Sequence, residues 1–270
     1  MNRFDTTFAA LKAQGRKALV PFVTAGDPSL AATVPVMHAL VAAGADVIEL
    51  GVPFSDPMAD GPTIQRSSEL ALGRGAGLRF VLEVVAAFRQ TDATTPVVLM
   101  GYLNPVEIHG AQRFAREAAD AGVDGALLVD LPPEEADETR EIFNRHGLQL
   151  IALAAPTTTP ERAALLCEQA QGYLYYVSFA GVTGASDRLD TQAAGERLRA
   201  LRAQSKVPVV AGFGIKDAAS AAAMAPDADG VVVGSALVKA ISEAASPQQA
   251  AELAGNFLRP LREALDQGLR

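Results

Sequence analysis

Residues 43–51 read Ala43-Gly44-Ala45-Asp46-Val47-Ile48-Glu49-Leu50-Gly51, a helix stop followed at once by a buried strand. The apolar run that begins at Val47 is too short for a helix and is rich in β-forming residues. Alternation places Ile48 and Leu50 on one face of this strand, and Val47, Glu49 and Gly51 on the other. A carboxylate in such a strand is costly to bury unless it is paired or partly protonated. Glu49 therefore marks a position with a special role.

The same pattern recurs further along the chain. Ala121-Gly122-Val123-Asp124 repeats the phrase of residues 43–46, with a glycine where a helix ends and an aspartate before the next strand. Helical patterns cover residues 31–43, 78–89, 113–121, 133–146 and 191–204. Between and around them, apolar runs typical of strands begin near eight positions: Leu19, Val47, Val97, Ala126, Leu150, Leu174, Val207 and Val231. The chain therefore consists of repeated strand–helix units.

Eight such units without a linker-like tract predict an α/β protein whose parallel sheet closes into a (β/α)8 TIM barrel. We expect residues 1–270 to form a single barrel domain. An open doubly wound sheet is the alternative. It is weakened because Thr24-Ala25-Gly26-Asp27-Pro28 follows the first strand in place of a Gly-x-Gly-x-x-Gly fingerprint.

An extra N-terminal helix is predicted before the first strand. Residues 2–14 carry Phe4, Phe8 and Leu11 at helical spacing, and Gly15 supplies a stop. This helix could close the bottom of the barrel or pack on its side, and the sequence is compatible with both.

The composition excludes some classes of function. Lys and Arg number 23 and Asp and Glu 31, for a net charge of −8, which argues against a nucleic-acid binder. A small anionic substrate stays compatible, because backbone amides at helix starts can hold phosphate. The single Cys167 excludes an internal disulfide framework and fits a reducing compartment. The charged N-terminus is no signal peptide, and no apolar run is long enough to span a membrane, so we expect a cytoplasmic protein.

The loop after the Glu49 strand reads Pro53-Phe54-Ser55-Asp56-Pro57-Met58-Ala59-Asp60-Gly61-Pro62. Its prolines and aspartates indicate a structured loop that carries a second acid, Asp60, at the strand end where barrel enzymes keep their chemistry. Other readings stay open: Glu49 as a structural ion pair, and Asp60 as a cap of the following helix. Asp56 and Asp130 are better interpreted as turn-forming or structural residues.

The remaining strand ends predict a mostly apolar and aromatic pocket, which suits a flat aromatic substrate. The side chains expected on its walls are those of Phe22, Thr24, Met100, Leu127, Val129, Tyr173, Tyr175 and Val177. At the last two strand ends, Gly212, Gly214 and Gly234 let the backbone and its N–H groups approach a ligand. Ser235 starts a short helix there, as in a barrel phosphate site. The small-residue loop of residues 178–186 is interpreted as a lid.

Several kinds of chemistry find no support. The five lysines lie before strands or in helices, so a Schiff base on a strand is not expected. His38, His109 and His146 are scattered without ligand spacing, so no metal site is predicted. No Ser or Cys occupies a nucleophile elbow. General acid–base catalysis by carboxylates is what remains.

The loop at residues 53–62 resembles the signature of the α subunit of tryptophan synthase. Further matching motifs follow in the same order: residues 21–28, Gly101-Tyr102-Leu103-Asn104-Pro105, Gly181-Val182-Thr183-Gly184, Gly212-Phe213-Gly214 and Gly234-Ser235. The resemblance implies a (β/α)8 lyase that cleaves indole-3-glycerol phosphate to indole and glyceraldehyde 3-phosphate in tryptophan biosynthesis.

The resemblance also implies residue roles. Glu49 would be the general acid–base residue, Asp60 the partner of the indole N–H, and Tyr175 an aid on the glycerol side. The implied substrate-binding residues fall into two groups. Phe22, Met100, Leu127 and Val129 would wall the indole, and Thr183, Gly184, Phe213, Gly214, Gly234 and Ser235 would surround the phosphate end. Phe179, at the start of the lid, departs from the polar or basic residue of many relatives.

Family members work as an αββα heterotetramer with a β subunit that carries pyridoxal phosphate and receives indole. The resemblance therefore implies this partner, no cofactor on this chain, and an interface formed by residues 53–60 and the segments near Asn104 and Pro132. Two related barrels, indole-glycerol-phosphate synthase and phosphoribosylanthranilate isomerase, are rivals, although the synthase needs a strand lysine that is absent. A non-catalytic barrel that only activates a partner is another, and intact Glu49 and Asp60 argue against it.

Overall fold

The computed structural model describes residues 2–177, 191–212 and 214–267, and within them nine parallel strands form one sheet. The sheet order is β5-β4-β3-β2-β1-β9-β8-β7-β6. The strands are β1 (Ala18–Thr24), β2 (Ile48–Gly51), β3 (Val97–Gly101), β4 (Gly125–Leu128), β5 (Gln149–Leu150), β6 (Ala152–Ala154), β7 (Leu174–Val177), β8 (Val209–Gly212) and β9 (Gly230–Val233).

The sheet closes on itself, because its two edge strands, β5 and β6, are consecutive in the chain and are joined by Ile151. The predicted barrel is therefore confirmed, with one difference. The fifth apolar run is two short strands interrupted at Ile151, whose N–H donates to the Ala126 carbonyl at 2.9 Å. An open doubly wound sheet is excluded by this closure.

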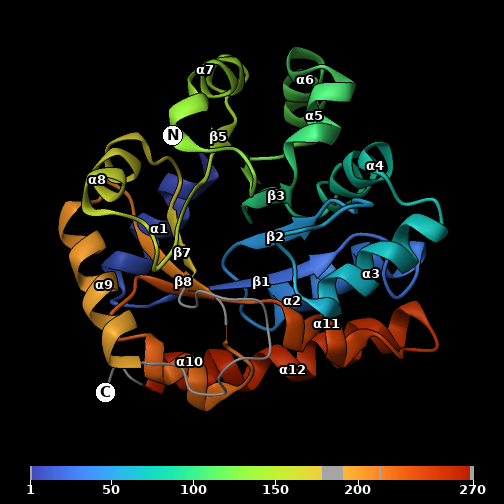
Figure 1. Ribbon diagram of the computed structural model, residues 1–270. Coiled ribbons are helices and arrows are strands. Elements are labelled where there is room, and N and C mark those ends of the chain that lie inside the picture. Colours follow the sequence, from blue (N-terminus) through green and yellow to red (C-terminus); the bar gives the residue numbers. More distant parts are fainter. Residues whose placement is uncertain (1, 178–190, 213, 268–270) are drawn as a thin grey trace.

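Helices surround the strands (Figure 1). The α-helices are α1 (Arg3–Ala13), α2 (Thr33–Ala42), α3 (Pro62–Gly73), α4 (Leu78–Phe88), α5 (Leu103–His109), α6 (Ala111–Ala121), α7 (Asp137–Arg145), α8 (Pro160–Gln169), α9 (Thr191–Gln204), α10 (Ala218–Met224), α11 (Ser235–Ile241) and α12 (Pro247–Gln267). Two short 3-10 helices, η1 (Leu30–Ala32) and η2 (Pro133–Glu135), precede α2 and α7. The helix expected over residues 133–146 is thus divided at Ala136 into η2 and α7.

The N-terminal helix α1 closes the bottom of the barrel. Phe4, Phe8 and Leu11 are buried in one cluster with inward-facing strand residues such as Val20 and Val98. The rings of Phe4 and Phe8 lie 5.9 and 6.1 Å from the ring of Tyr173, just before β7. The sequence left open whether this helix closes the bottom of the barrel or packs on its side, and the structure shows that it closes the bottom.

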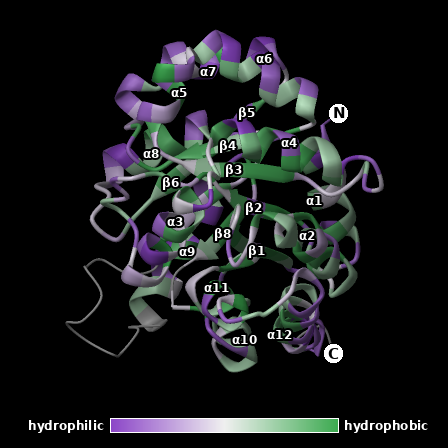
Figure 2. Ribbon diagram, turned by 90° about the vertical axis from the view of Figure 1, so that its right-hand side faces the viewer, coloured by the Kyte–Doolittle hydropathy of each residue, from purple (hydrophilic) through white to green (hydrophobic). Residues whose placement is uncertain are grey.

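Period-two alternation separates two cores. Val47 packs inside the barrel, whereas Ile48 and Leu50 belong to the larger core between the strands and the helices. Both faces of the strands are apolar for this reason, which Figure 2 shows as green strands against the purple outer faces of helices such as α6 and α7. The predicted faces of β2 are confirmed, and Glu49 points into the barrel.

The recurring Gly-x-Asp phrase has a physical explanation. Gly44 and Gly122 adopt φ values of +100° and +91°, and each packs against an arginine stem where a Cβ would collide. The aspartate two residues later accepts an N–H at the start of the preceding strand, so Asp46 accepts from Leu19 N and Asp124 from Val97 N, both at 2.8 Å.

When the broken β5 and β6 are counted as one strand, the same kind of bond recurs at every second strand. Asp229 accepts from Val209 N at 2.9 Å, and the amide oxygen of Gln171 accepts from Leu150 N at 3.0 Å. Each of the three aspartates also pairs with an arginine. The barrel is therefore built from four units, β1–β2, β3–β4, the broken β5–β6 with β7, and β8–β9, and in each the first strand is tied to a residue shortly before the last one.

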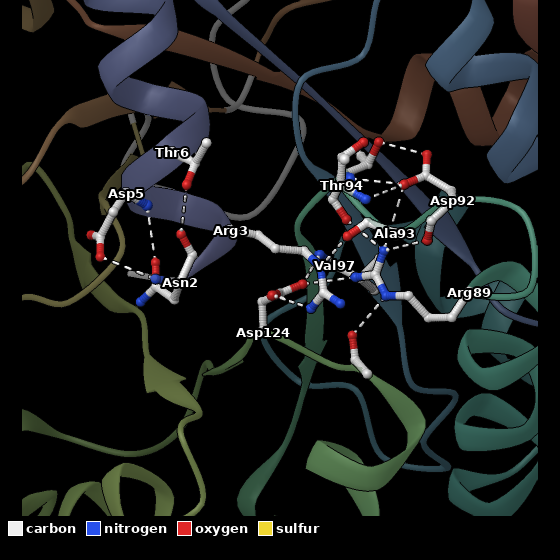
Figure 3. A network of polar contacts seen from close by, with 12 residues as sticks. Asn2, Arg3, Asp5, Thr6, Arg89, Asp92, Ala93, Thr94, Val97 and Asp124 are labelled. Carbon is white, nitrogen blue, oxygen red and sulfur yellow. Dashed lines mark hydrogen bonds and ion pairs between the residues drawn. The ribbon is translucent and has the colours of Figure 1, made fainter.

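At the bottom of the barrel, Asp124 is the centre of a charged network (Figure 3). Arg3 of α1 donates to its Oδ1 at 2.9 Å, and Arg89 donates to its Oδ2 at 2.8 Å. Arg89 also donates to the carbonyls of Gly122 and Thr95. Because a buried charge is tolerated only when it is paired and hydrogen-bonded, this network fixes α1 against the strands it covers.

Candidate active site

Glu49 lies in the middle of the barrel and is completely buried. It stands on β2 opposite Phe22 of β1 and Val98 of β3. The hydroxyl of Tyr173 donates to its Oε1 at 2.5 Å, and its Oε2 has no hydrogen-bond partner among the described residues. Burial raises the pKa of Glu49 to about 7, and the bond from Tyr173 opposes that rise. No cation pairs with it in the described part of the chain, so the structure gives no support there to the ion-pair alternative.

Tyr175 lies on the same inner face, two residues after Tyr173. Its hydroxyl is seated over Gly212 of β8, where a Cβ would come within 2.0 Å of the phenol oxygen. Burial raises the pKa of Tyr175, and the charges of Glu49 and Asp60 both add to that rise. Both acids therefore lie within electrostatic reach of this one phenol.

Asp60 lies on the loop between β2 and α3. Tyr102, directly after β3, donates its hydroxyl to Oδ2 of Asp60 at 3.0 Å and accepts from Ala59 N at 3.0 Å. Burial raises the pKa of Asp60, and the Tyr102 bond opposes the rise. Gly61 is the N-cap of α3 and no side chain caps that helix, so the capping interpretation of Asp60 is wrong.

The expected apolar wall forms around these acids. Leu127 is buried in the inner cluster, and Met100 and Val129 pack against it at the carboxyl ends of β3 and β4. Phe22 packs with Ile64 of α3, Val238 of α11 and Met100. The ring of Phe22 also fills the space over Gly51, where a Cβ would lie 2.6 Å from it.

The structure describes part of the phosphate site that the sequence predicts after the last two strands. Gly234 is the N-cap of α11, Ser235 is its first residue and is exposed, and a Cβ at Gly234 would lie 3.6 Å from Phe22. Gly214 adopts a φ of +78° after β8 and is exposed. The helix start therefore adjoins the apolar wall. Three predicted site residues, Thr183, Gly184 and Phe213, lie outside the described residues, as does the lid of residues 178–186 with Phe179.

Two aspartates have structural contacts, in line with their interpretation from the sequence. Asp130 accepts from Leu103 N at the start of α5 at 2.8 Å. Asp56 is exposed and accepts from its neighbour Ser55 at 2.5 Å.

Two phenols bind the acids, and neither bond was predicted. Tyr173 was expected on the pocket wall, on the face of Tyr175, but not as the hydrogen-bond partner of Glu49. Tyr102 had no such signal, because its reach to Asp60 depends on the path of the loop.

Some kinds of site find no support in the described ranges. No group of three His, Cys, Asp or Glu side chains gathers there as a metal ion would require. In the same part of the chain, no helix is long and apolar enough to cross a membrane.

A closed parallel barrel, with a buried carboxyl group on one strand and a second on the loop after it, defines a (β/α)8-barrel enzyme. The model of the family "Tryptophan synthase alpha chain" matches residues 8–265. A tryptophan synthase alpha chain of Xanthomonas euvesicatoria is 74% identical over 267 residues, which cover 99% of this chain and 100% of that one.

Solved structures agree with this family. Tryptophan synthase subunit alpha from Legionella pneumophila superposes with a TM-score of 0.90 at 48% identity and covers 99% of both chains. A chain of tryptophan synthase from M. tuberculosis, in an aminoacrylate-bound form, gives a TM-score of 0.84 at 39% identity, over 97% of this chain and 100% of that one.

The chain belongs to the tryptophan synthase alpha chain family. It is a lyase that cleaves indole-3-glycerol phosphate to indole and glyceraldehyde 3-phosphate in tryptophan biosynthesis. By family, the alpha chain carries out this cleavage without a cofactor.

Proposed function

We propose that Glu49 is the general acid–base residue of the cleavage. The observation that carries this proposal is its complete burial inside the barrel, with a pKa raised to about 7. A group that titrates near the working pH is populated in both forms, so it can donate a proton at one step and accept one at the next.

One carboxyl group can serve both as the proton donor and as the proton acceptor of the reaction, because the protons balance over the turnover. Protonated Glu49 gives its proton to indole C3, which leaves a cationic indolenine nitrogen and a Glu49 carboxylate. That carboxylate then takes the proton of the glycerol C3′ hydroxyl. The C3′ carbonyl forms, the C3–C3′ bond breaks, and its electron pair neutralises the nitrogen as indole is restored. Glu49 ends the turnover protonated, as it began. We assign Tyr175 to the glycerol side, beside the Glu49 carboxyl.

We propose that Asp60 accepts the indole N–H and stabilises the cationic nitrogen. The hydroxyl of Tyr102 supports this role, because its hydrogen bond to Oδ2 favours the charged form of Asp60. A fixed negative charge opposite a developing positive charge lowers the barrier most where water is excluded. Phe22, Met100, Leu127 and Val129 would hold the indole ring between the two acids.

We propose that the phosphate binds at the start of α11. The amide of Ser235 at the first turn and the flexible backbone at Gly214 and Gly234 would supply donors without a lysine. The contact between Gly234 and Phe22 supports this position, because it joins the phosphate end to the indole wall. Thr183, Gly184 and Phe213 complete the proposed substrate-binding set.

A Tyr173→Phe variant tests the acid–base role. The hydroxyl lost in this variant donates to Glu49 and lowers its pKa, so its removal leaves burial unopposed. The limb of the pH–kcat profile that reports Glu49 should therefore move to higher pH, with only a small change in KM.

The matched control for this test is Tyr176→Phe. Tyr176 is also buried on β7 but packs in the outer core, so the profile should stay in place. A profile unmoved in Tyr173→Phe would show that another group titrates.

We propose that this chain works with a tryptophan synthase β subunit in an αββα heterotetramer, and that the β subunit carries the pyridoxal phosphate. The surface near Asp60 supports a partner there. Met58 and Ile108 are each 80% exposed, although both are large and apolar. Phe54 of the same loop stacks on Tyr102 with ring centroids 5.0 Å apart. A subunit seated on residues 53–60, Asn104 and Pro132 would therefore press on the Tyr102–Asp60 pair.

This proposal predicts activation. Purified chain is mixed with indole-3-glycerol phosphate, with and without a β subunit, and indole is followed over time. The β subunit should raise kcat, and Met58→Asp with Ile108→Asp should reduce that activation while sparing the basal rate. Equal indole formation in both mixtures, with no complex on gel filtration, would contradict the proposed partner.

A further inference from the structure

Tyr102, which takes no direct part in the proposed reaction, joins three segments around Asp60. It is the N-cap of α5, directly after β3, and is 4% exposed. Its hydroxyl donates to Oδ2 of Asp60 at 3.0 Å and accepts from the backbone N–H of Ala59 at 3.0 Å. The ring of Phe54 packs on its ring, with centroids 5.0 Å apart and planes inclined by 31°. One phenol therefore connects β3, α5 and the loop that carries Asp60.

The backbone of Asp60 is fixed independently of this contact. Its N–H donates to the carbonyl of Pro57 at 3.0 Å, and its carbonyl accepts from the side chain of Gln65 at 2.9 Å. Because both backbone groups are bound, the carboxyl group is the part of Asp60 that can still turn. Tyr102 holds one oxygen of that group, and Oδ1 has no hydrogen-bond partner among the described residues. Asp60 is partly exposed, so this second oxygen is left for a ligand.

The hydroxyl of Tyr102 is held as a donor. Burial raises its pKa, and the negative charge of Asp60 raises it further, so the phenol keeps its proton at neutral pH. The amide of Ala59 donates to the same oxygen, and a hydroxyl that accepts one hydrogen bond donates the next one more strongly. Asp130 accepts the N–H of Leu103 at 2.8 Å and so fixes the backbone next to Tyr102. The phenol therefore reaches Asp60 from a rigid support.

Asp60 depends on this one donor. Burial raises the pKa of Asp60 and thereby favours its neutral form, which has no charge to place opposite a cationic nitrogen. The bond from Tyr102 opposes the rise, because a hydrogen bond to a carboxylate favours the charged form. No other side chain of the described residues donates to this carboxyl group. Its charge and its direction are therefore set by the same contact.

We propose that Tyr102 is a positioning residue of the reaction, whose hydroxyl holds Oδ2 of Asp60 so that the carboxyl group stays charged and presents Oδ1 to the indole N–H. This role rests on the function proposed for Asp60, through which Tyr102 acts without touching the substrate. Phe54 and the start of α5 keep the phenol in place.

The two phenols that bind the acids then control opposite limbs of the pH–kcat profile. A turnover starts with Glu49 protonated and Asp60 ionised. The value of kcat therefore falls at low pH as Asp60 gains a proton, and at high pH as Glu49 loses one. The acid limb reports Asp60 and its donor Tyr102, and the basic limb reports Glu49 and its donor Tyr173.

Tyr102→Phe tests this role, because it keeps the ring against Phe54 and removes the hydroxyl. Without its donor, Asp60 binds a proton more readily, so the acid limb should move to higher pH. At neutral pH, kcat should fall about tenfold with little change in KM, as the loss of one hydrogen bond to a charged group predicts. The basic limb should stay in place, which also shows that the variant is folded. Tyr176→Phe removes a buried phenol of the outer core and should move neither limb.

A double variant separates positioning of the acid from a general effect on the loop. In an Asp60→Asn background the hydroxyl has no charge to stabilise, so adding Tyr102→Phe should change kcat by less than about twofold. Losses that multiply would show that Tyr102 acts apart from Asp60 and would overturn the proposal. An acid limb that stays in place in Tyr102→Phe overturns it too, although a loss in Asp60→Asn alone would still support the role of that acid. Full activity of Asp60→Asn overturns both.

Discussion

Glutamine in place of Glu49 is expected to abolish indole formation, with a loss in kcat of about 10³–10⁴-fold. Glutamine keeps the shape of the side chain and can still accept the Tyr173 hydroxyl, but it can neither give nor take a proton. Because the walls around the substrate are unchanged, KM should stay close to that of the parent enzyme. Initial rates of indole release, together with direct substrate binding to the inactive variant, measure both effects.

The pH dependence of stability provides a second readout of the same residue. Its pKa rises from 4.5 to about 7 on folding, so the folded protein holds a proton that the unfolded chain releases between these values. The free energy of unfolding therefore falls by about 3 kcal/mol in total as the pH rises from 4.5 to about 7. Glu49→Gln should lack this decline and unfold at higher denaturant concentration above pH 7. Retained turnover in the variant would defeat the assignment.

Asparagine in place of Asp60 is expected to lower kcat by about 10²–10³-fold, as the loss of an electrostatic stabiliser predicts. The amide oxygen can still accept the indole N–H and the Tyr102 hydroxyl. What the variant lacks is the negative charge opposite the cationic nitrogen, which exists only from the protonation of indole C3 until the C3–C3′ bond has broken. The loss should therefore fall on kcat rather than on KM, in steady-state assays of indole formation.

A matched control lies four residues earlier in the same loop. Asp56 is exposed and bonds to Ser55, so Asp56→Asn should leave kcat within about twofold, as for a surface change away from the site. An equal loss in both variants would mean that the loop depends on charge for its structure, and the role proposed for Asp60 would fail.

Much of the barrel could be predicted because local patterns are sufficient for it. The apolar runs locate the strands to within two residues, and period-two alternation alone places Glu49 inside with Val47 and opposite to Ile48. The glycine and aspartate between helix and strand are equally local signals. In the structure, Gly44 adopts a positive φ, and Asp46 accepts a hydrogen bond from the preceding strand.

Partners that come from distant segments could not be predicted in this way. The pKa of Glu49 depends on Tyr173, 124 residues away in the sequence, and Asp60 depends on Tyr102, which is 42 residues away. The choice for α1 between plug and side helix was likewise decided by contact with Tyr173. The break at Ile151 has no composition signal, because a short strand and a broken one are equally apolar.

By itself, the sequence determined the strand–helix order, the inward direction of Glu49 and the family of the chain. These depend on residue type and spacing along the backbone, which are local. Only the tertiary structure decided that a tyrosine hydroxyl donates to each acid, that Asp60 is no helix cap, and that the fifth strand is broken at Ile151. The reason is that burial and hydrogen bonding between distant segments exist only once the barrel has closed.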